Sequence, residues 1–294
     1  TFCAPPTMYR FFIKEDLSKY DLSSIEYATT AGEALNPEVF NQFKKATGLT
    51  IMEGFGQTES TMIIGNMVGA GHKIGSMGKA APIYDVKLLD SDGKEVAVGE
   101  TGEICVKVAD GAPCGLFKGY YKDEERTKEA IDENGYFHTG DKGCFDEDGL
   151  LKITGRIKEI FKTSMGKYIS PVLIENKIKE SPFIGELLVI GEGQKFAAAL
   201  IYPNFEHLKS WCKIKNIPYT NDEEMIKNKD VIMRFRKEID KYNADLGDYE
   251  QVKKFELIAK EWTIESGEMT ASLKPRRSKI MQNYADLVEK IYAE

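Results

Sequence analysis

The sequence changes character twice, and these changes limit the folds that are open to the chain. Up to about residue 74, a helical pattern alternates with short apolar runs, as in α/β domains. From about residue 75 to 157, apolar runs are separated by tight turns, a pattern typical of antiparallel β structure. From residue 158 onwards helices and strands mix again. The length of 294 residues also fits two domains at roughly 150 residues each. We therefore expect domains at 1–157 and 158–294.

Local signals predict individual helices and strands. Asn36 is a good N-cap, Pro37 suits the first helical position and Gly48 stops a helix, so a helix is expected between them. Further helices are predicted over 122–131, 171–180, 205–215, 231–244 and 278–292. Strands are predicted over 49–53, 86–89, 103–108, 186–190, 196–201 and 255–259.

Composition excludes several classes of protein. No apolar run approaches the roughly 18 residues that a membrane span needs. The net charge of −7 argues against a nucleic-acid partner. Five scattered cysteines without a CxxC pair, and three histidines far apart, argue against a disulfide framework and a His/Cys metal cluster. This cysteine usage indicates a reducing, cytoplasmic location. The oligomeric state is not indicated.

Four segments combine glycine with acidic or hydroxyl side chains, and we expect them to form loops. They are residues 31–34, 54–59, 136–141 and 154–156. Such a loop suits a phosphate beside Mg²⁺, because glycines let backbone N–H groups approach, Thr58 can donate and Glu59 can hold the cation. For any one segment alone, a tight turn that needs a positive φ is the better explanation.

Taken in order, the segments resemble the acyl-adenylate-forming (AMP-binding) superfamily, and within it the acyl-CoA synthetases. Residues 54–59 resemble its aromatic-Gly-x-Thr-Glu motif, 100–104 its Gly-Glu-hydrophobic barrel strand, 138–141 its Thr-Gly-Asp motif and 155–162 its hinge motif. Residues 2–149 resemble medium-chain synthetases, and the chain from Leu151 onwards resembles long-chain ones.

The resemblance implies a fold of mixed α/β and α+β class. Residues 1–157 would be the end of the large AMP-binding domain, α/β to about residue 74 and a small β-barrel over about 75–157. Residues 158–294 would be a mobile α+β C-terminal domain. The family's Ser/Thr/Gly-rich phosphate loop does not occur in the sequence. We therefore expect the chain to be the C-terminal portion of a longer synthetase.

The resemblance also implies roles in nucleotide binding. Gly32, Glu33, Ala34 and Phe55 would line the adenine, with Phe55 stacking on it; the alternative is a core phenylalanine. Thr58 would contact the α-phosphate and Glu59 the Mg²⁺, within a motif that also contains Gly54, Gly56 and Gln57.

Two further residues would bind the ribose. Asp141 would accept hydrogen bonds from its hydroxyls and Arg156 would reach the same sugar, because ionised acceptors make strong hydrogen bonds. The alternative for this pair is a structural ion pair.

The remaining implied roles lie at the hinge and beyond it. Lys158 would be the hinge residue, or else a solvated turn residue. Lys274 would bridge the substrate carboxylate and the α-phosphate, because a mobile ammonium stabilises charge on a transferring phosphoryl group. The alternative for Lys274 is the basic start of a surface helix. Ser164, Gly166 and Lys167 would meet coenzyme A, with a plain turn as the alternative.

The resemblance implies an ATP-dependent carboxylate–CoA ligase that forms acyl-AMP and then acyl-CoA from a medium- or long-chain fatty acid. Its ligands would be the fatty acid or another carboxylate, ATP/AMP, Mg²⁺ and coenzyme A. Two alternatives stay open: an adenylation domain that loads a carrier protein, and a non-catalytic nucleotide-binding fragment.

Overall fold

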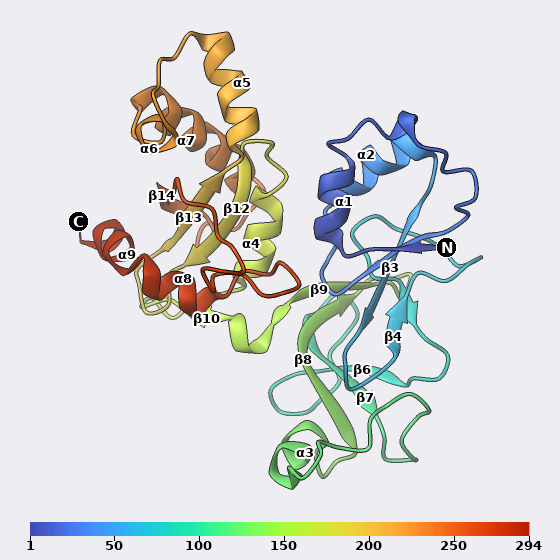
Figure 1. The fold of residues 1–294 in the computed structure, drawn as a ribbon. Helices are drawn as coiled ribbons and strands as arrows, with labels where there is room; N and C mark the ends of the chain where they lie inside the picture. The colour runs from blue at the N-terminus through green and yellow to red at the C-terminus, as the bar shows by residue number, and fades with distance from the viewer. Residues whose placement is uncertain (294) are drawn as a thin grey trace. The chain divides into compact units, whose positions relative to one another are not determined.

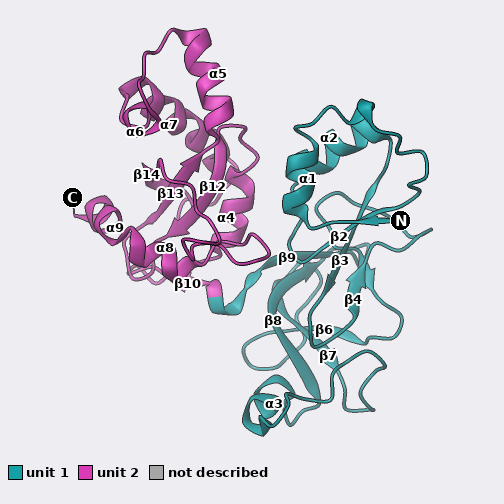
Figure 2. Ribbon diagram, viewed as in Figure 1, with its two compact units in different colours: residues 1–158 teal, residues 159–294 magenta. Residues whose placement is uncertain are grey.

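The computed structural model describes residues 1–293, which form two compact units (Figures 1 and 2). Unit 1 is Thr1–Lys158, and unit 2 begins at Glu159. The sequence placed its domain boundary one residue earlier. The mixed fold class is confirmed, since helices and several sheets occur in both units. In the described part of the chain, no helix is long and apolar enough to cross a membrane.

Unit 1 begins with a five-stranded sheet in the order β1-β2-β3-β4-β5. The first three strands are parallel, and β4 and β5 join antiparallel. The elements are β1 (Phe2–Cys3), α1 (Pro6–Phe12), the 3₁₀ turn η1 (Leu17–Lys19), β2 (Ala28–Ala31), α2 (Pro37–Thr47), β3 (Ile51–Gly56), β4 (Met62–Gly65) and β5 (Lys79–Ala80).

Helix α2 forms as its sequence predicts. The Asn36 side chain accepts hydrogen bonds from the N–H groups of Glu38 and Val39, and Gly48 ends the helix at φ 77°. The helix buries Phe40 and Phe43 in a core cluster with Tyr9 and Ile51. The layer of α1 and α2 thereby fixes β2 and β3, the two strands that lead into the candidate site.

The second sheet of unit 1 has four antiparallel strands in the order β6-β7-β8-β9. They are β6 (Val86–Leu89), β7 (Gly102–Lys107), β8 (Tyr136–Phe145) and β9 (Leu151–Arg156), and α3 (Glu124–Ala130) lies between β7 and β8 in sequence. Among the described residues, no strand pairing closes this sheet, so the small β-barrel expected here is an open sheet. The 3₁₀ turn η2 (Ile157–Glu159) follows β9.

Unit 2 is a three-stranded sheet, β12-β13-β14, with helices on both faces. Strands β12 and β13 are antiparallel, and β13 and β14 are parallel. Its elements are β10 (Phe161–Lys162), β11 (Tyr168–Ile169), α4 (Pro171–Ile178), β12 (Ile184–Ile190), β13 (Ala197–Pro203), α5 (Phe205–Lys215), α6 (Asp222–Met225), α7 (Lys229–Asn243), β14 (Val252–Leu257), α8 (Arg277–Asn283) and α9 (Ala285–Tyr292).

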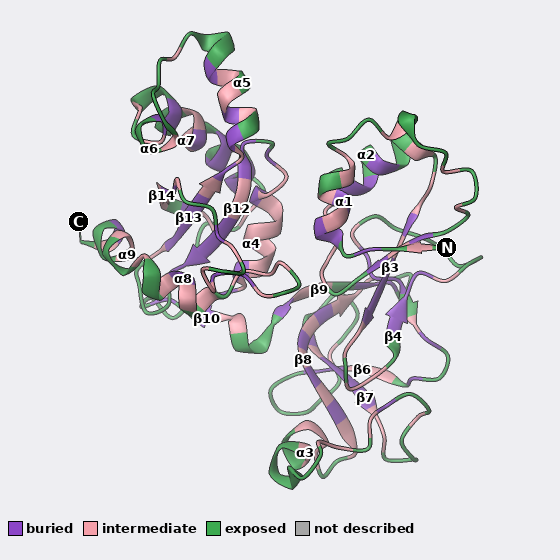
Figure 3. Cartoon of the chain, viewed as in Figure 1, coloured by how far each residue is buried: buried purple, intermediate pink, exposed green. Residues whose placement is uncertain are grey.

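The central sheet of unit 2 is buried on both faces (Figure 3). Leu187 and Val189 pack into the cluster formed with α4, α5 and α7, whereas Leu188 and Ile190 pack into the cluster formed with α8 and α9. A strand covered on both faces needs apolar side chains at every position. This explains the continuous apolar run Leu187–Ile190 at the end of β12.

Two expected loops are strands instead. Residues 136–141 lie inside β8 and residues 154–156 inside β9. Glu103 of β7 pairs with Lys142 of β8, and Cys105 pairs with His138. One residue between the pairs on β7 therefore faces three on β8, so β8 carries a bulge, which contains Gly140 at φ 73°. The glycine serves this bulge, and it does not mark a loop.

The last predicted helix, 278–292, is broken into α8 and α9 at Tyr284, which leaves helical geometry with φ −116° and ψ 28°. Asn283, the last residue of α8, donates a hydrogen bond to the carboxylate of Glu268, which is 1% exposed. This tertiary contact holds the end of α8, and the helical pattern of the sequence does not reveal it.

We expect Leu187→Ala to lower the free energy of unfolding of unit 2 by about 2–5 kcal/mol, because it leaves a cavity where a fully buried side chain stood. Both tryptophans, Trp211 and Trp262, belong to unit 2, so tryptophan fluorescence in a urea titration reports this unit. The exposed control Lys195→Ala should change stability by no more than about 0.5 kcal/mol. Equal effects of the two substitutions would contradict the burial of Leu187.

Candidate functional site

Two of the predicted segments leave the same edge of the first sheet. Strands β2 and β3 are parallel, and Ala31 at the end of β2 pairs with Gly54. Residues 32–34 therefore emerge beside residues 54–59. Ligands of α/β sheets commonly bind at this carboxyl edge of parallel strands.

The glycines at this edge have different roles. Gly32 has a φ of 94°, as a tight turn requires. Gly54 and Gly56 are extended residues of β3, so the positive-φ explanation is wrong for them. A Cβ on Gly56 would lie 2.5 Å from the backbone oxygen of Thr61, so this glycine allows close contact with the chain leading into β4. Glu33 accepts a 3.4 Å hydrogen bond from Thr7, and Ala34 packs against the core.

Residues 57–60 form a turn that directly follows β3. The N–H of Ser60 donates to the Gln57 carbonyl at 3.1 Å, which leaves Thr58 exposed at the turn. Glu59 Oε1 accepts a 2.8 Å hydrogen bond from the Tyr120 hydroxyl. The Arg126 guanidinium lies 3.9 Å from the centroid of the Tyr120 ring. The turn thus presents a hydroxyl and an oriented carboxylate side by side.

Asp141 of β8 is the centre of a network that joins three elements. Its carboxylate is nearly buried, and the residue is 5% exposed. Gln57 Nε2 donates to Asp141 Oδ2 at 2.7 Å and to the Thr139 carbonyl at 2.8 Å. Arg156 Nε of β9 donates to Asp141 Oδ1 at 3.0 Å. The predicted pairing of Asp141 and Arg156 is therefore an ion pair in this structure. A carboxylate has about four acceptor positions, so it can still accept from a ligand.

The bulge in β8 positions Asp141. The Asp141 N–H donates to Thr139 Oγ1 at 3.1 Å, and that hydroxyl donates to the Ile104 carbonyl of β7 at 2.7 Å. The N–H of Gly140 donates to Glu103 Oε1 at 3.0 Å. Both contacts tie the bulge to β7, so Asp141 is held from the neighbouring strand as well as by its own partners.

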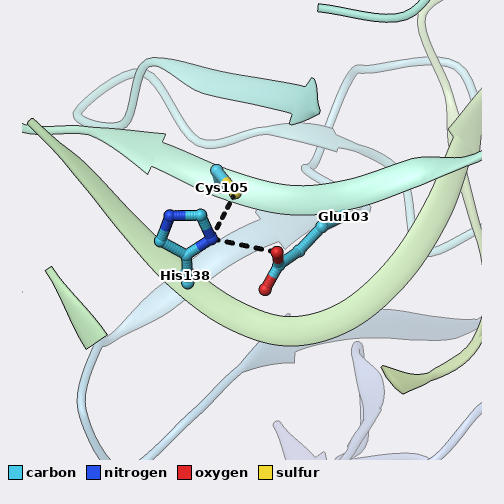
Figure 4. A group of neighbouring side chains, drawn as sticks. All are labelled: Glu103, Cys105 and His138. Atoms are coloured by element: carbon cyan, nitrogen blue, oxygen red, sulfur yellow. Dashed lines mark hydrogen bonds and ion pairs between the residues drawn. The ribbon is translucent and has the colours of Figure 1, made fainter. Parts of the chain in front are cut away.

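Beside this bulge lies a cluster that the sequence did not reveal, formed by Glu103, Cys105 and His138 (Figure 4). His138 Nδ1 is 2.9 Å from Glu103 Oε2 and 3.5 Å from Cys105 Sγ. These contacts with Cys105 and Glu103 raise the pKa of His138 well above its usual range. Cys105 and His138 are 33 residues apart in sequence, so ligand spacing could not have found them.

A pocket of about 800 Å³ opens along β2, β3 and β4, and Phe55, Met52, Met62 and Met67 are among its lining residues. Phe55 is 8% exposed and also belongs to the core cluster of unit 1, so it faces both environments.

Glu53 is the acidic residue of that pocket. It is 4% exposed, and one carboxylate oxygen accepts a 2.9 Å hydrogen bond from the Leu35 N–H. Burial raises the pKa of Glu53 to about 7, and this hydrogen bond opposes the shift. The only signal for Glu53 in the sequence is a single charge at the end of an apolar run.

In unit 2, three predicted residues lie in the turn between β10 and β11. The N–H of Gly166, at φ 80°, donates to the Thr163 carbonyl at 2.9 Å, and that of Ser164 donates to the Gln194 carbonyl at 2.9 Å. Lys167 is exposed, and its ammonium lies 5.7 Å from the centroid of the Tyr249 ring. The turn is a regular one that presents a glycine and a lysine to solvent.

Lys274 lies in a second turn of unit 2. Its N–H donates to Thr270 Oγ1 at 3.0 Å, and its carbonyl accepts from the Thr270 N–H at 2.8 Å. Leu273 adopts a φ of 59°, rare for a residue with a side chain. Glu268 supports the turn, since its backbone oxygen accepts from the Arg276 N–H at 2.7 Å. Lys274 thus precedes α8 and stands on an ordered turn outside any helix.

In unit 1, hydrogen bonds connect predicted residues at the edge of the first sheet with predicted residues of β8 and β9. Gln57, Asp141 and Arg156 form one hydrogen-bonded chain, and Thr58 and Glu59 share the turn that begins at Gln57. Lys158 is an exposed residue of η2, at the end of unit 1. The role of Tyr120 was missed, because its contact with Glu59 joins residues 61 positions apart.

Two family models match the chain. The AMP-binding enzyme model matches residues 1–121, and the model of the AMP-binding enzyme C-terminal domain matches residues 158–294. Together these segments cover 258 of the 294 residues.

Two curated relatives illustrate the sequence similarity. "Acyl-coenzyme A synthetase ACSM3, mitochondrial" of Mus musculus is 40% identical over 189 residues, which are 64% of this chain and 32% of the relative. "4-hydroxybutyrate--CoA ligase 1" of Metallosphaera sedula is 43% identical over 192 residues, which are 65% of this chain and 33% of the relative. The matched part of the chain spans about a third of the length of these relatives.

Solved structures resemble the chain over nearly its whole length. The anthranilate CoA ligase AuaEII, in complex with anthranoyl-AMP, matches with a TM-score of 0.75 and 25% identity, over 98% of this chain and 49% of that one. ATP-bound MatB from Rhodopseudomonas palustris matches with a TM-score of 0.73 and 22% identity, over 97% and 51%. The second likeness concerns the fold alone.

Glu53 gives a pH-dependent prediction. Folding raises its pKa from 4.5 to about 7, so its neutral form is favoured in the folded state, and stability falls as the pH rises from about 4.5 to about 7. Glu53→Gln removes this loss. We compare the unfolding free energy of the variant with that of the original protein at each pH. We expect this difference, variant minus original, to rise by about 2–3 kcal/mol from pH 5 to pH 8.

Urea unfolding followed by circular dichroism measures this difference, and tryptophan fluorescence separates the contribution of unit 2. The original protein and the variant are compared at both pH values. A difference between them that is the same at pH 5 and pH 8 would contradict the raised pKa.

Proposed function

The chain belongs to the AMP-binding enzyme family, and from this premise we propose that the protein is an ATP-dependent carboxylate–CoA ligase. The substrate carboxylate attacks the α-phosphate of ATP, which releases pyrophosphate and forms acyl-AMP. The thiol of coenzyme A then attacks the acyl carbon and releases AMP. The names of the mouse and Metallosphaera relatives, an acyl-CoA synthetase and a CoA ligase, support this reaction class.

The observation that carries the proposal is the network of Gln57, Asp141 and Arg156. It places a buried carboxylate next to the turn after β3, where Thr58 and Glu59 lie. In the proposed site Asp141 accepts from the ribose hydroxyls, and Arg156, whose side chain is about half exposed, reaches the same sugar.

The proposed adenine site lies where β2 and β3 end. Gly32, Glu33 and Ala34 line the base, and Phe55 stacks on it; Gly54, Gly56 and Gln57 complete that edge. This assignment is supported by the pairing of Ala31 with Gly54, which brings the ends of the two strands together.

Mg²⁺ is proposed to bind at Glu59. The donor chemistry fits, because a carboxylate is a hard oxygen ligand and Tyr120 engages only Oε1. When bound, the ion offsets negative charge on the phosphates. In the proposed site the Thr58 hydroxyl donates a hydrogen bond to an α-phosphate oxygen. The hydrogen bond from Tyr120 holds the Glu59 carboxylate in place beside it.

Unit 2 supplies the proposed groups that alternate between the two steps. Lys274 provides an ammonium to the carboxylate and the α-phosphate during adenylation. A rotation at Lys158 then replaces it with the turn of Ser164, Gly166 and Lys167, which meets coenzyme A. A domain rotation lets one site serve two reactions with different geometry. In this proposal residues 1–157 are part of the large AMP-binding domain and 158–294 are the mobile domain.

We propose a medium- or long-chain fatty acid as the substrate. Met52, Met62, Met67 and Phe55 contribute apolar surface to the pocket along β2, β3 and β4, and such surface suits an aliphatic chain. The five free cysteines support a reducing compartment, and we propose the cytoplasm, although the name of the mouse relative places that protein in mitochondria.

ATP–pyrophosphate exchange tests adenylation. With carboxylates from acetate to palmitate, we expect acid-dependent exchange that Lys274→Ala slows by about 10²–10³-fold, since the ammonium stabilises charge in the transition state. The control Lys260→Ala changes an exposed lysine elsewhere in unit 2 and should leave the rate unchanged.

The outcomes separate the candidate functions. Exchange with subsequent acyl-CoA formation supports the ligase, whereas exchange without acyl-CoA points to an adenylation domain that loads a carrier protein. No exchange, with AMP still bound in calorimetry, identifies a nucleotide-binding protein without turnover and overturns the proposed activity.

Asp141→Asn should weaken AMP binding by about 10–100-fold in calorimetry, because the ribose loses a charged acceptor. Asp146→Asn, at the far end of the same β8–β9 hairpin, is the matched control and should bind AMP normally. If Asp141→Asn lowers stability and leaves AMP affinity unchanged, Asp141 and Arg156 form only a structural ion pair.

A further inference from the structure

The cluster of Glu103, Cys105 and His138 is built by the register of two strands. Glu103 and Cys105 are two residues apart on β7, and Cys105 is paired with His138 on β8. Side chains two apart on a strand point to the same face. Figure 4 shows the three side chains directed toward one another, although they come from two segments far apart in sequence.

The three ligand atoms have the spacing of a metal site. One atom from each side chain lies within 4.8 Å of the other two. A tetrahedral zinc ion with bonds of about 2.0 Å to nitrogen and 2.3 Å to sulfur separates those two atoms by roughly 3.5 Å. The observed separation of Cys105 Sγ and His138 Nδ1 is 3.5 Å. Glu103 Oε2 lies 2.9 Å from Nδ1, a few tenths of an ångström less than the roughly 3.3 Å that two zinc bonds of about 2.0 Å give.

The imidazole also has an outer partner. Asp132 Oδ2 lies 3.5 Å from Nε2, on the side of the ring opposite the cluster. Asp132 is itself held, because Oδ1 accepts a 2.8 Å hydrogen bond from the Tyr136 N–H. A metal-bound histidine usually donates its second N–H to such a carboxylate, which orients the ring and directs the other nitrogen to the ion.

The cluster is accessible from one side and closed on the other. The side chains of His138 and Glu103 are 28% and 19% exposed, whereas Cys105 is fully buried. An ion can therefore enter past the carboxylate and the ring and reach a thiol that is shielded from solvent.

We propose that Glu103, Cys105 and His138 bind a divalent zinc-type ion, with Asp132 as the outer partner of the histidine. A sulfur, a nitrogen and one carboxylate oxygen are a donor set that Zn²⁺ prefers and Mg²⁺ does not. This site is separate from the proposed Mg²⁺ at Glu59. Its existence does not depend on the proposed ligase activity.

Binding exchanges protons for the ion. The Cys105 thiol loses its proton to solvent and binds as the thiolate, and His138 loses the proton on Nδ1 and binds through that nitrogen. Glu103 binds as the carboxylate. The three ligands leave a fourth tetrahedral position for water.

Titration with Co²⁺, a coloured substitute for Zn²⁺, tests the site directly. The full chain, without a histidine tag and stripped of metal with a chelator, is titrated while its absorption is recorded. We expect one Co²⁺ per chain, with a sulfur-to-cobalt charge-transfer band and the intense visible bands of a four-coordinate ion. One equivalent of Zn²⁺ should displace it.

Variants identify the ligands. Cys105→Ser should abolish the charge-transfer band, and His138→Gln should weaken Co²⁺ binding at least 10-fold, as should Glu103→Gln. Cys144→Ser, on the same strand as His138, and His72→Gln are matched controls and should bind as the original protein does. Circular dichroism verifies the fold of each variant. If Cys105→Ser does not fold, the Co²⁺ affinity of His138→Gln is the deciding measurement, because the His138 side chain is partly exposed and its replacement disturbs the core less.

Three results would overturn the proposal. The first is a titration of the original protein without a sulfur-to-cobalt band. The second is a band that persists in folded Cys105→Ser, and the third is Co²⁺ affinity that is unchanged in His138→Gln, because in both cases other residues would hold the ion.

Discussion

The buried carboxylate of Asp141 is the interaction on which the unit 1 site depends. A charge removed from water is tolerated only when partners compensate for its lost hydration. Here Gln57 and Arg156 provide that compensation, and they come from the turn after β3 and from β9. The carboxylate therefore joins the two sheets of unit 1, and the same atoms that stabilise the fold define the candidate site.

The strand pairing of β7 and β8 decides what surrounds Asp141. The bulge at Gly140 brings the N–H of Gly140 to Glu103 and that of Asp141 to Thr139. Glu103 also contacts His138 through its other oxygen. One carboxylate thus connects the bulge that positions Asp141 with the cluster proposed to bind zinc, so the two sites share a structural element.

Unit 2 presents its candidate residues on turns supported by a rigid sheet. The sheet is buried on both faces, and the turns of Gly166 and Lys274 lie outside it. Glu268, almost completely buried, bonds Asn283 of α8 and supports the turn that carries Lys274. A lysine on an ordered backbone turn suits a group proposed to act in only one of two steps.

The sequence by itself determined the local features: the caps of α2, the apolar run of β12 and the order of motifs that identified the family. These depend on residues close together in the chain. Tertiary structure alone decided that 136–141 is a bulged strand, that helix 278–292 breaks at Tyr284, and that Cys105 meets His138. The bulge and the contact of Cys105 with His138 follow from strand register, which the whole sheet sets. The break at Tyr284 accompanies the contact of Asn283 with the buried Glu268, and such contacts between separate segments are not encoded in a local pattern.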